Sequence, residues 1–350
     1  MSTRCLRHSL GRCLVLLAAI GAPAAARAQA PIDSSALQVF DIRAKDQSRQ
    51  APVVTAVAIS ADGHWLAAGG DDHLVRIWNV TDGDLARELK SHSDWVRAVA
   101  FDPAGERLAS AGDDHAVLLW NTKSMQVETR LPDPAQVVYG VAFNADGSLL
   151  AAAGFSEKVR LFDTRSAKAL QDLNAPGPEN RALAISPDGK RLAVGGRQGR
   201  IRVWSLPDGA VMHDLKSDSL RIRALAFSPD SAVLAAGGDA RQIRLFDVAT
   251  GKDAGALPSR PGKTLALAFC GGSKLAAGGS DNLIRIWDTT TGVETLRLAG
   301  HAGSVSSLAY HAESGLLASG SFDTTVRIWD VARGAQGKPV RQAAKPQDAR

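Results

Sequence analysis

A run of the form apolar–any residue–apolar–aromatic recurs along the chain. Its copies are LVRIW (74–78), AVLLW (116–120), KVRLF (158–162), RIRVW (200–204), QIRLF (242–246), LIRIW (283–287) and TVRIW (325–329). Successive aromatic residues lie 42 positions apart, except for one interval of 41 between Phe246 and Trp287. Alternating side chains of an extended strand lie on opposite faces, so each run predicts a short β-strand. A fixed period of about 40–45 residues built on short strands is typical of propeller blades.

Each repeat has room for four strands. In the second repeat these are WVRAVAF (95–101), ERLASAG (106–112), AVLLW (116–120) and VETRL (127–131), from the innermost strand outward. The turn DPAG joins the first two, and its Gly105 suits the positive φ that such turns need. The sixth repeat has CGGS at this turn, one residue shorter, which accounts for the interval of 41.

The in-register copies resemble the WD40 repeat family over residues 36–332. The resemblance implies an all-β fold, a seven-bladed β-propeller of four-stranded antiparallel blades. Its blades are anchored at Trp78, Trp120, Phe162, Trp204, Phe246, Trp287 and Trp329. The last repeat has no obvious outer strand, because Pro339 suits a strand interior poorly. We therefore expect the alternating segment ALQVFDIR (36–43) to close blade 7 and hide its edge.

Blades 2 and 7 each contain His, Ser, Asp and Trp at intervals of 18, 4 and 6 residues. The two sets are His92, Ser110, Asp114, Trp120 and His301, Ser319, Asp323, Trp329. In WD40 proteins such positions form a buried structural tetrad in which Asp accepts hydrogen bonds from His and Ser. Asp72 and Asp281 keep the aspartate alone, and Ser156, Gln198 and Ala240 replace it. We expect mainly apolar packing to hold blades 3–5.

Other interpretations of these polar residues are weaker. A Ser–His–Asp set resembles a hydrolase triad, but identical sets in two blades that turn inward offer no nucleophile to a substrate. Asp71, His73, Asp113 and His115 could be imagined as a metal site, yet they fit solvated turns. No CxxC, HExxH or phosphate-binding glycine loop stands at a credible position. We predict no catalytic residue, no metal and no cofactor.

A series of arginines stands two residues before the anchor aromatic. Its members are Arg76, Arg160, Arg202, Arg244, Arg285 and Arg327. So regular a series favours charge pairing along the strand faces over a ligand site.

The resemblance also indicates where a partner would bind. WD40 partners commonly meet the positions 25, 23 and 7 residues before the anchor aromatic. In blades 2–5 these positions hold a group of aromatic and arginine residues: Trp95, Arg97, Tyr139, Phe155, Arg181, Arg197, Arg221 and Arg223. Blade 6 supplies Gly262 and Thr264 at the first two positions. Over all seven blades Glu179, in blade 4, is the sole acid at these two positions. Because aromatics and arginine dominate binding hot spots, we expect this top face to dock an extended or acidic peptide; a solvated rim is the alternative.

Residues 1–28 predict a secretory signal peptide. Arg4, Arg7 and Arg12 precede the apolar segment CLVLLAAIGAPAAARA (13–28), which ends in small residues. Of the two A-x-A sites, the second would leave Pro31 after the cut, so we expect a mature start at Gln29. With the alanine-rich, arginine-biased composition, this suggests a bacterial protein exported to the periplasm or exterior. A cytoplasmic protein with an apolar leader is the alternative.

Charge and cysteine content narrow the function further. The net charge of +5 falls to +1 without residues 1–28, and the basic tail 333–350 carries +4. The propeller, residues 29–332, is therefore about −3, which argues against nucleic-acid binding. Cys270 is the one cysteine outside the leader, which excludes an internal disulfide. We expect a disordered tail, a monomeric propeller and no transmembrane segment in the mature chain.

These features favour an exported, non-enzymatic scaffold that binds a protein on its top face. One alternative is an exported lactonase-like enzyme with a metal in the central channel. That needs convergent His, Asp, Glu or Asn at the mouths of the inner strands, where the sequence has Ala, Val, Leu, Thr and Arg. Another alternative is a binder of polyanions or the envelope surface that uses the tail and the arginine sector.

Overall fold

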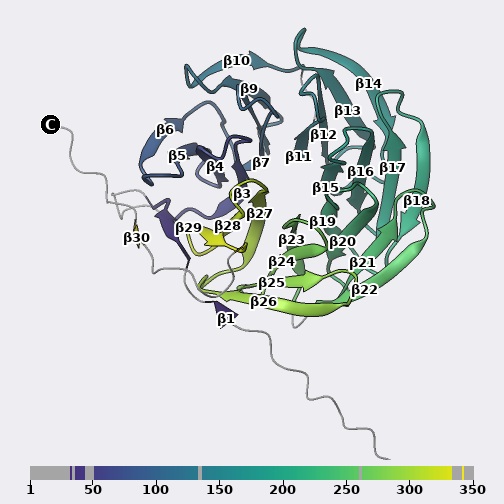
Figure 1. Cartoon of the computed structure of the whole chain (residues 1–350). Coiled ribbons are helices and arrows are strands. Elements are labelled where there is room, and N and C mark those ends of the chain that lie inside the picture. The colour runs from purple at the N-terminus through teal and green to yellow at the C-terminus, as the bar shows by residue number, and fades with distance from the viewer. Residues whose placement is uncertain are drawn as a thin grey trace, which may run out of the picture.

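The computed structural model describes residues 32–33, 36–43, 51–132, 136–259, 262–332 and 341–342. These residues form seven sheets that stand as blades around a central axis, and the four main strands of each blade are antiparallel (Figure 1). Within each of the first six blades the strands follow one another outward in chain order. The predicted fold class, a seven-bladed propeller of four-stranded blades, is confirmed.

The strands occupy four positions in each blade. The innermost strands are β3 (Val54–Ile59), β7 (Val96–Phe101), β11 (Val138–Phe143), β15 (Asn180–Ile185), β19 (Ile222–Phe227), β23 (Thr264–Phe269) and β27 (Val305–His311). The second strands are β4 (Trp65–Gly70), β8 (Arg107–Gly112), β12 (Leu149–Gly154), β16 (Arg191–Gly196), β20 (Val233–Gly238), β24 (Lys274–Gly279) and β28 (Leu316–Ser321). The third strands are β5 (Val75–Asn79), β9 (Val117–Asn121), β13 (Lys158–Asp163), β17 (Arg200–Ser205), β21 (Gln242–Asp247), β25 (Leu283–Asp288) and β29 (Thr325–Asp330). The outer strands of blades 1–6 are β6 (Leu85–Leu89), β10 (Gln126–Arg130), β14 (Lys168–Asn174), β18 (Val211–Lys216), β22 (Asp253–Pro258) and β26 (Val293–Ala299).

The core lies between neighbouring blades. The second strands are buried on both faces, which explains why β12 reads LLAAAG without polar alternation. The anchor aromatics pack into these layers, and Trp204 and Trp329 are each only 1% exposed. The blades approach so closely that a Cβ on Gly237 would lie 2.6 Å from Thr264 Cγ2. Small residues at such positions let the flat faces of successive blades come into contact.

The ring is closed by the N-terminal segment. Strand β2 (Gln38–Asp41) pairs antiparallel with β29, with Gln38 opposite Ile328. Phe40 is buried, and its ring centroid lies 5.5 Å from that of Trp78 in blade 1. The prediction that 36–43 completes blade 7 is confirmed.

Two short strands from near the chain ends extend the outer edges of blades 6 and 7 (Figure 1). Strand β1 (Ile32–Asp33) pairs parallel with β26, and β30 (Arg341–Gln342) pairs parallel with β2. The sequence pattern predicted neither. The expected signal peptide, residues 1–28, lies outside the described residues, as does the predicted tail 333–350 apart from β30. Within the described ranges, no helix is long and apolar enough to cross a membrane.

Candidate functional site

The predicted tetrads of blades 2 and 7 are linear hydrogen-bonded chains. In blade 2, Trp120 Nε1 donates to Ser110 Oγ over 2.8 Å, and Ser110 Oγ lies 2.7 Å from His92 Nε2. His92 Nδ1 lies 2.8 Å from Asp114 Oδ2. Blade 7 repeats this order, with 2.8, 2.7 and 2.9 Å along Trp329, Ser319, His301 and Asp323. The serine therefore bonds the histidine and not the aspartate, which corrects the expected pattern, because the imidazole stands between the two.

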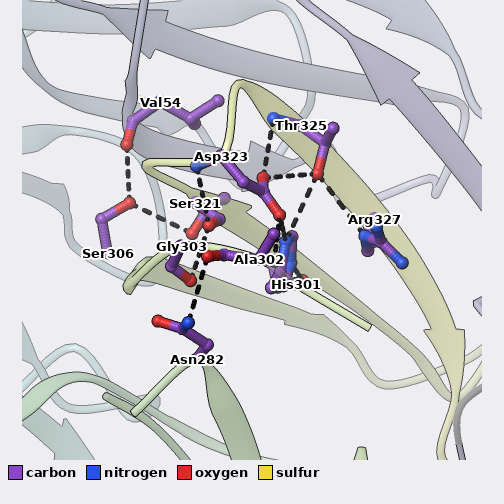
Figure 2. A network of polar contacts seen from close by, with 12 residues as sticks. Val54, Asn282, His301, Ala302, Gly303, Ser306, Ser321, Asp323, Thr325 and Arg327 are labelled. Atoms are coloured by element: carbon purple, nitrogen blue, oxygen red, sulfur yellow. Dashed lines mark hydrogen bonds and ion pairs between the residues drawn. The ribbon is translucent and has the colours of Figure 1, made fainter. Parts of the chain in front are cut away.

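One arrangement of protons satisfies every side-chain donor in each tetrad. The indole fills one acceptor position of the serine, whose own proton then goes to the histidine Nε2, and the neutral ring donates from Nδ1 to the carboxylate. Burial lowers the pKa of His301 and outweighs the pull of Asp323. Burial would raise the pKa of Asp323, but hydrogen bonds from His301 and Thr325 lower it (Figure 2). In blade 7 these shifts favour a neutral imidazole beside a charged carboxylate.

The Ser110–His92–Asp114 distances are those of a hydrolase triad, but the surroundings are not. Ser110 and Ser319 are each 0% exposed, and each hydroxyl already accepts a bond from an indole. A nucleophile needs space beside it for the reacting carbonyl. These two tetrads therefore stabilise blades 2 and 7 and are not catalytic triads.

Blades 4 and 5 use buried polar residues that the sequence motifs did not reveal. Asn180 is fully buried, and its Nδ2 donates to Ser156 O of blade 3 over 2.8 Å. In blade 5, Ser219 N donates to Ser217 Oγ over 3.0 Å, and Ser219 Oγ donates to Arg221 O over 2.6 Å. The expectation that mainly apolar packing holds these blades left out this buried polar layer.

The arginines two residues before the anchors pair with carboxylates, as predicted. Arg76 Nη2 lies 2.7 Å from Asp72, and Arg285 Nη2 lies 2.6 Å from Asp281, so the aspartates without a histidine partner receive a guanidinium. Arg160, Arg202 and Arg244 reach Asp172, Asp214 and Asp253 on the neighbouring outer strands. Arg327 instead donates to the Thr325 hydroxyl over 3.4 Å (Figure 2).

The DDH segments are turns. His73 and His115 take positive φ angles of 69° and 60°, which are left-handed turn conformations. Across the described part of the chain, no three His, Cys, Asp or Glu side chains gather closely enough to hold a metal ion.

The central axis opens at one face into a cavity of about 300 Å³. Each blade contributes three consecutive residues of its inner-strand segment to the wall, and the first of each three are Thr55, Arg97, Tyr139, Arg181, Arg223, Leu265 and Ser306. The blade 6 member is Leu265, whereas counting from the anchor indicated Thr264, which is only 2% exposed. The residue absent from the CGGS turn lies between this strand and the anchor, so the register is shifted by one. For the same reason Lys263, not Gly262, occupies the preceding position, where its carbonyl accepts from Ser280 N over 3.0 Å.

Five side chains of blades 2–4 form one stack at the mouth of this cavity: Trp95, Arg97, Tyr139, Phe155 and Arg181. The Arg97 guanidinium carbon lies 4.3 Å from the Trp95 ring centroid and 5.1 Å from that of Tyr139. Arg181 lies 4.6 Å from Tyr139 and 5.1 Å from Phe155, and the two rings stack at 4.8 Å. Cations over aromatic faces attract them electrostatically, so the stack is internally stabilised. Part of the aromatic surface that the sequence offered to a partner is covered by the protein's own arginines.

Carboxylates lie beside every arginine of the mouth. Arg97 binds Asp113 through Nε and Nη2 at 2.8 and 2.6 Å. Glu179 meets three guanidiniums, with Arg181 Nε at 2.9 Å, Arg197 Nε at 2.7 Å and Arg221 Nε at 3.5 Å. Burial would raise the pKa of Glu179, but the hydrogen bond and charge of Arg181, together with the other two guanidiniums, lower it.

The fifth blade contributes a further ion pair. Arg223 Nε lies 2.6 Å from Asp239 Oδ1, which also faces Lys263 Nζ at 4.0 Å. The sequence series had not paired these residues, because Asp239 belongs to a different series and Lys263 was displaced by the register shift. The mouth thus combines cations and acids from blades 2 to 6.

Comparison with known proteins identifies the family to which this propeller belongs. Residues 53–271 match the family model described as the IFT122 first beta-propeller, and residues 261–288 and 292–330 match the WD domain, G-beta repeat. This chain belongs to the WD40-repeat β-propellers. A probable serine/threonine-protein kinase, PkwA of Thermomonospora curvata, is 48% identical over 42 residues. That match covers 12% of this chain and 6% of the kinase, so it supports similarity of a single repeat.

The WD40 propeller brings all eight predicted partner-binding residues to one face, around the cavity. Two further apolar residues add to them: Leu220, which precedes Arg221, is 78% exposed, and Phe322 of blade 7 at the cavity wall is 48% exposed. Trp95, one of the eight, is 37% exposed. Leu220 was not predicted because it lies outside the three positions per blade that the family commonly uses.

Proposed function

We propose that this WD40 propeller is an exported, non-enzymatic scaffold that binds a protein partner on the face around the cavity. The observation that carries the proposal is the connected cluster of aromatic, arginine and acidic side chains from four consecutive blades, 2–5. Ion pairs and stacking hold these side chains in place before binding, which reduces the conformational entropy that a partner must overcome. Arginine and aromatic residues are also the types that contribute most to protein interfaces.

The lactonase-like alternative finds less support in the cavity wall. The described residues that line the cavity include no carboxylate and no imidazole. A metal-assisted hydrolase would need such groups to converge there. The basic and apolar groups present are better suited to holding another chain than to activating water.

The experiment is affinity capture from the native envelope fraction. The bait is the full chain, either unchanged or carrying Trp95→Ala with Arg221→Ala. A matched bait carries Leu170→Ala with Arg165→Ala, which removes an exposed apolar residue and an exposed arginine from blade 3 outside the cavity face. We expect the unchanged and matched baits to capture one protein, and the bait with Trp95→Ala and Arg221→Ala to lose it. The melting temperature of that bait should equal that of the unchanged protein. Equal capture by all three baits would overturn the proposal.

Export is tested separately. A reporter that is active only outside the cytoplasm is fused after residue 43, with or without residues 1–28. We expect activity only with residues 1–28, because a basic segment followed by an apolar one and small residues directs secretion. Activity that is absent from both fusions would place the protein in the cytoplasm.

A further inference from the structure

Glu179 is surrounded by more positive charge than it can neutralise. Arg181 on β15, Arg197 in the turn before β17 and Arg221 before β19 all direct Nε toward its carboxylate. Their neighbours Arg223 and Lys263 share Asp239. Five cations in this sector therefore face two carboxylates, and an excess of three positive charges remains. Like charges so close together repel, so a further anion would lower the free energy of the cluster.

The guanidinium groups are also incompletely used. The described contacts of Arg181, Arg197 and Arg221 with Glu179, and of Arg223 with Asp239, are made through Nε. The edge formed by the two Nη atoms is the part of a guanidinium that binds a carboxylate through two parallel hydrogen bonds. Arg197 and Arg221 have side chains that are 56% and 36% exposed, so their Nη edges are within reach of a partner.

We infer that the partner presents an acidic peptide segment, and that its carboxylates bind the Nη edges of Arg197 and Arg221. This inference rests on the proposed function and names the chemistry of the bound segment. Glu179 then acts as a resident carboxylate, which keeps the guanidiniums ordered and weakens their hold on an incoming acid. An isosteric Glu179→Gln change should therefore tighten binding.

The neighbouring surface favours a peptide over a sugar polyanion. Leu220 lies beside Arg221 in the chain and is 78% exposed, and the cavity wall carries the half-exposed Phe322. An apolar side chain beside Arg221, and another on the wall of the central cavity, suit a segment in which acidic and apolar residues are mixed. A sulfated or phosphorylated polysaccharide would leave these apolar groups uncovered.

The test is fluorescence anisotropy with a labelled poly-L-glutamate peptide and the full chain. We expect Arg197→Ala with Arg221→Ala to weaken binding at least about tenfold, because close interfacial charge pairs contribute about 1.5 kcal/mol or more. A matched double variant, Arg87→Ala with Arg165→Ala, removes the same charge from exposed positions elsewhere and should change binding less than about twofold. The basic tail is present in every variant, so a difference in affinity between the variants reports on this site.

Glu179→Gln provides the second measurement. We expect several-fold tighter binding of poly-L-glutamate than by the unchanged protein. Arg197→Lys with Arg221→Lys keeps the charge without the planar edge and should give intermediate affinity. Melting curves accompany each variant, so that a loss of folding is recognised and the remaining variants decide.

Several outcomes would overturn the inference. They are equal binding by the two double variants, binding of poly-L-glutamine as tight as poly-L-glutamate, weaker binding by folded Glu179→Gln, or tighter binding of heparin that depends on the same arginines. The proposed scaffold function is tested independently of this inference. If the partner from the envelope is lost with Trp95→Ala and retained with Arg197→Ala and Arg221→Ala, the scaffold function stands and the acidic segment does not.

Discussion

Arg181 lies across the ring of Tyr139, with its guanidinium carbon 4.6 Å from the ring centroid. Arg97 contacts the same ring, with its guanidinium carbon 5.1 Å from the centroid. One aromatic side chain in blade 3 thus positions an arginine from each neighbouring blade. We expect Tyr139→Ala to lower the free energy of unfolding by about 1–2 kcal/mol, since each cation–π contact at a partly exposed site contributes about 0.5–1 kcal/mol.

Urea denaturation measures this change, and Tyr139→Phe is its control. Phenylalanine keeps the ring face, so the free energy of unfolding should stay within about 0.5 kcal/mol of the unchanged protein. An equal loss in both variants would assign the stabilisation to the hydroxyl and not to the stack.

The closing strand supports a second prediction. Deleting residues 29–43 removes β1 and β2, leaves the outer edge of β29 unpaired and uncovers the core around Trp78, so the melting temperature should fall sharply. Deleting only 29–35 removes β1 and keeps the pairing of β2 with β29. Its melting temperature should fall much less. Similar losses in the two deletions would show that blade 6 edge pairing, and not closure of blade 7, sustains the ring.

The hydroxyl of Ser110 is a third target. Ser110→Ala leaves the Trp120 indole N–H and the His92 Nε2 without their buried partner. An orphaned buried polar group costs about 1–3 kcal/mol, so we expect a loss of that size in urea denaturation. Ser124→Ala, in an exposed turn of the same blade, should be neutral within about 0.5 kcal/mol. A neutral Ser110→Ala would mean that water replaces the hydroxyl.

The tetrad of blade 7 predicts a pH dependence. The pKa of His301 is lowered from its ordinary 6.5 by burial, and the pKa of Asp323 is lowered from 3.8 because hydrogen bonds outweigh burial. Both shifts mean that the unfolded chain binds more protons than the native one, so stability falls as pH falls. The loss begins below about pH 6.5 through His301 and steepens below about pH 4 through Asp323.

Urea midpoints measured across this range check the prediction. The difference in stability between the unchanged protein and Asp323→Asn should shrink as pH falls through the acidic range, because the aspartate contribution is lost there. A difference that stays constant between neutral pH and pH 3 would contradict the assigned pKa shift of Asp323.

Much of the fold was predictable because the propeller repeats a local pattern. The anchors locate the third strands, and the absent outer strand of the last repeat pointed to residues 36–43. The position of Leu265 was missed because counting from an anchor carries the deletion in CGGS into the preceding strand. The short turn was visible in the sequence, and counting forward from the previous blade would have corrected it.

The candidate site was predictable by residue type and location but not by contacts. The sequence series place Arg181, Arg197 and Arg221 on one face. Their meeting at Glu179 depends on the angle between blades 4 and 5, which no spacing encodes. The sequence therefore suggested an open arginine surface, whereas the structure has a partly neutralised one with its Nη edges left for a partner.

The pairing of β2 with β29 has a consequence for how the chain is made. Gln38 and its partner Ile328 are 290 residues apart, so at about 5–20 residues per second of synthesis the N-terminal strand waits roughly 15–60 s for its neighbour. During that time the first blades can stack, but the ring remains an open arc with an exposed edge at each end. A ribosome that stalls before blade 7 thus releases a chain with two unsatisfied sheet edges, which makes late truncation a direct route to aggregation.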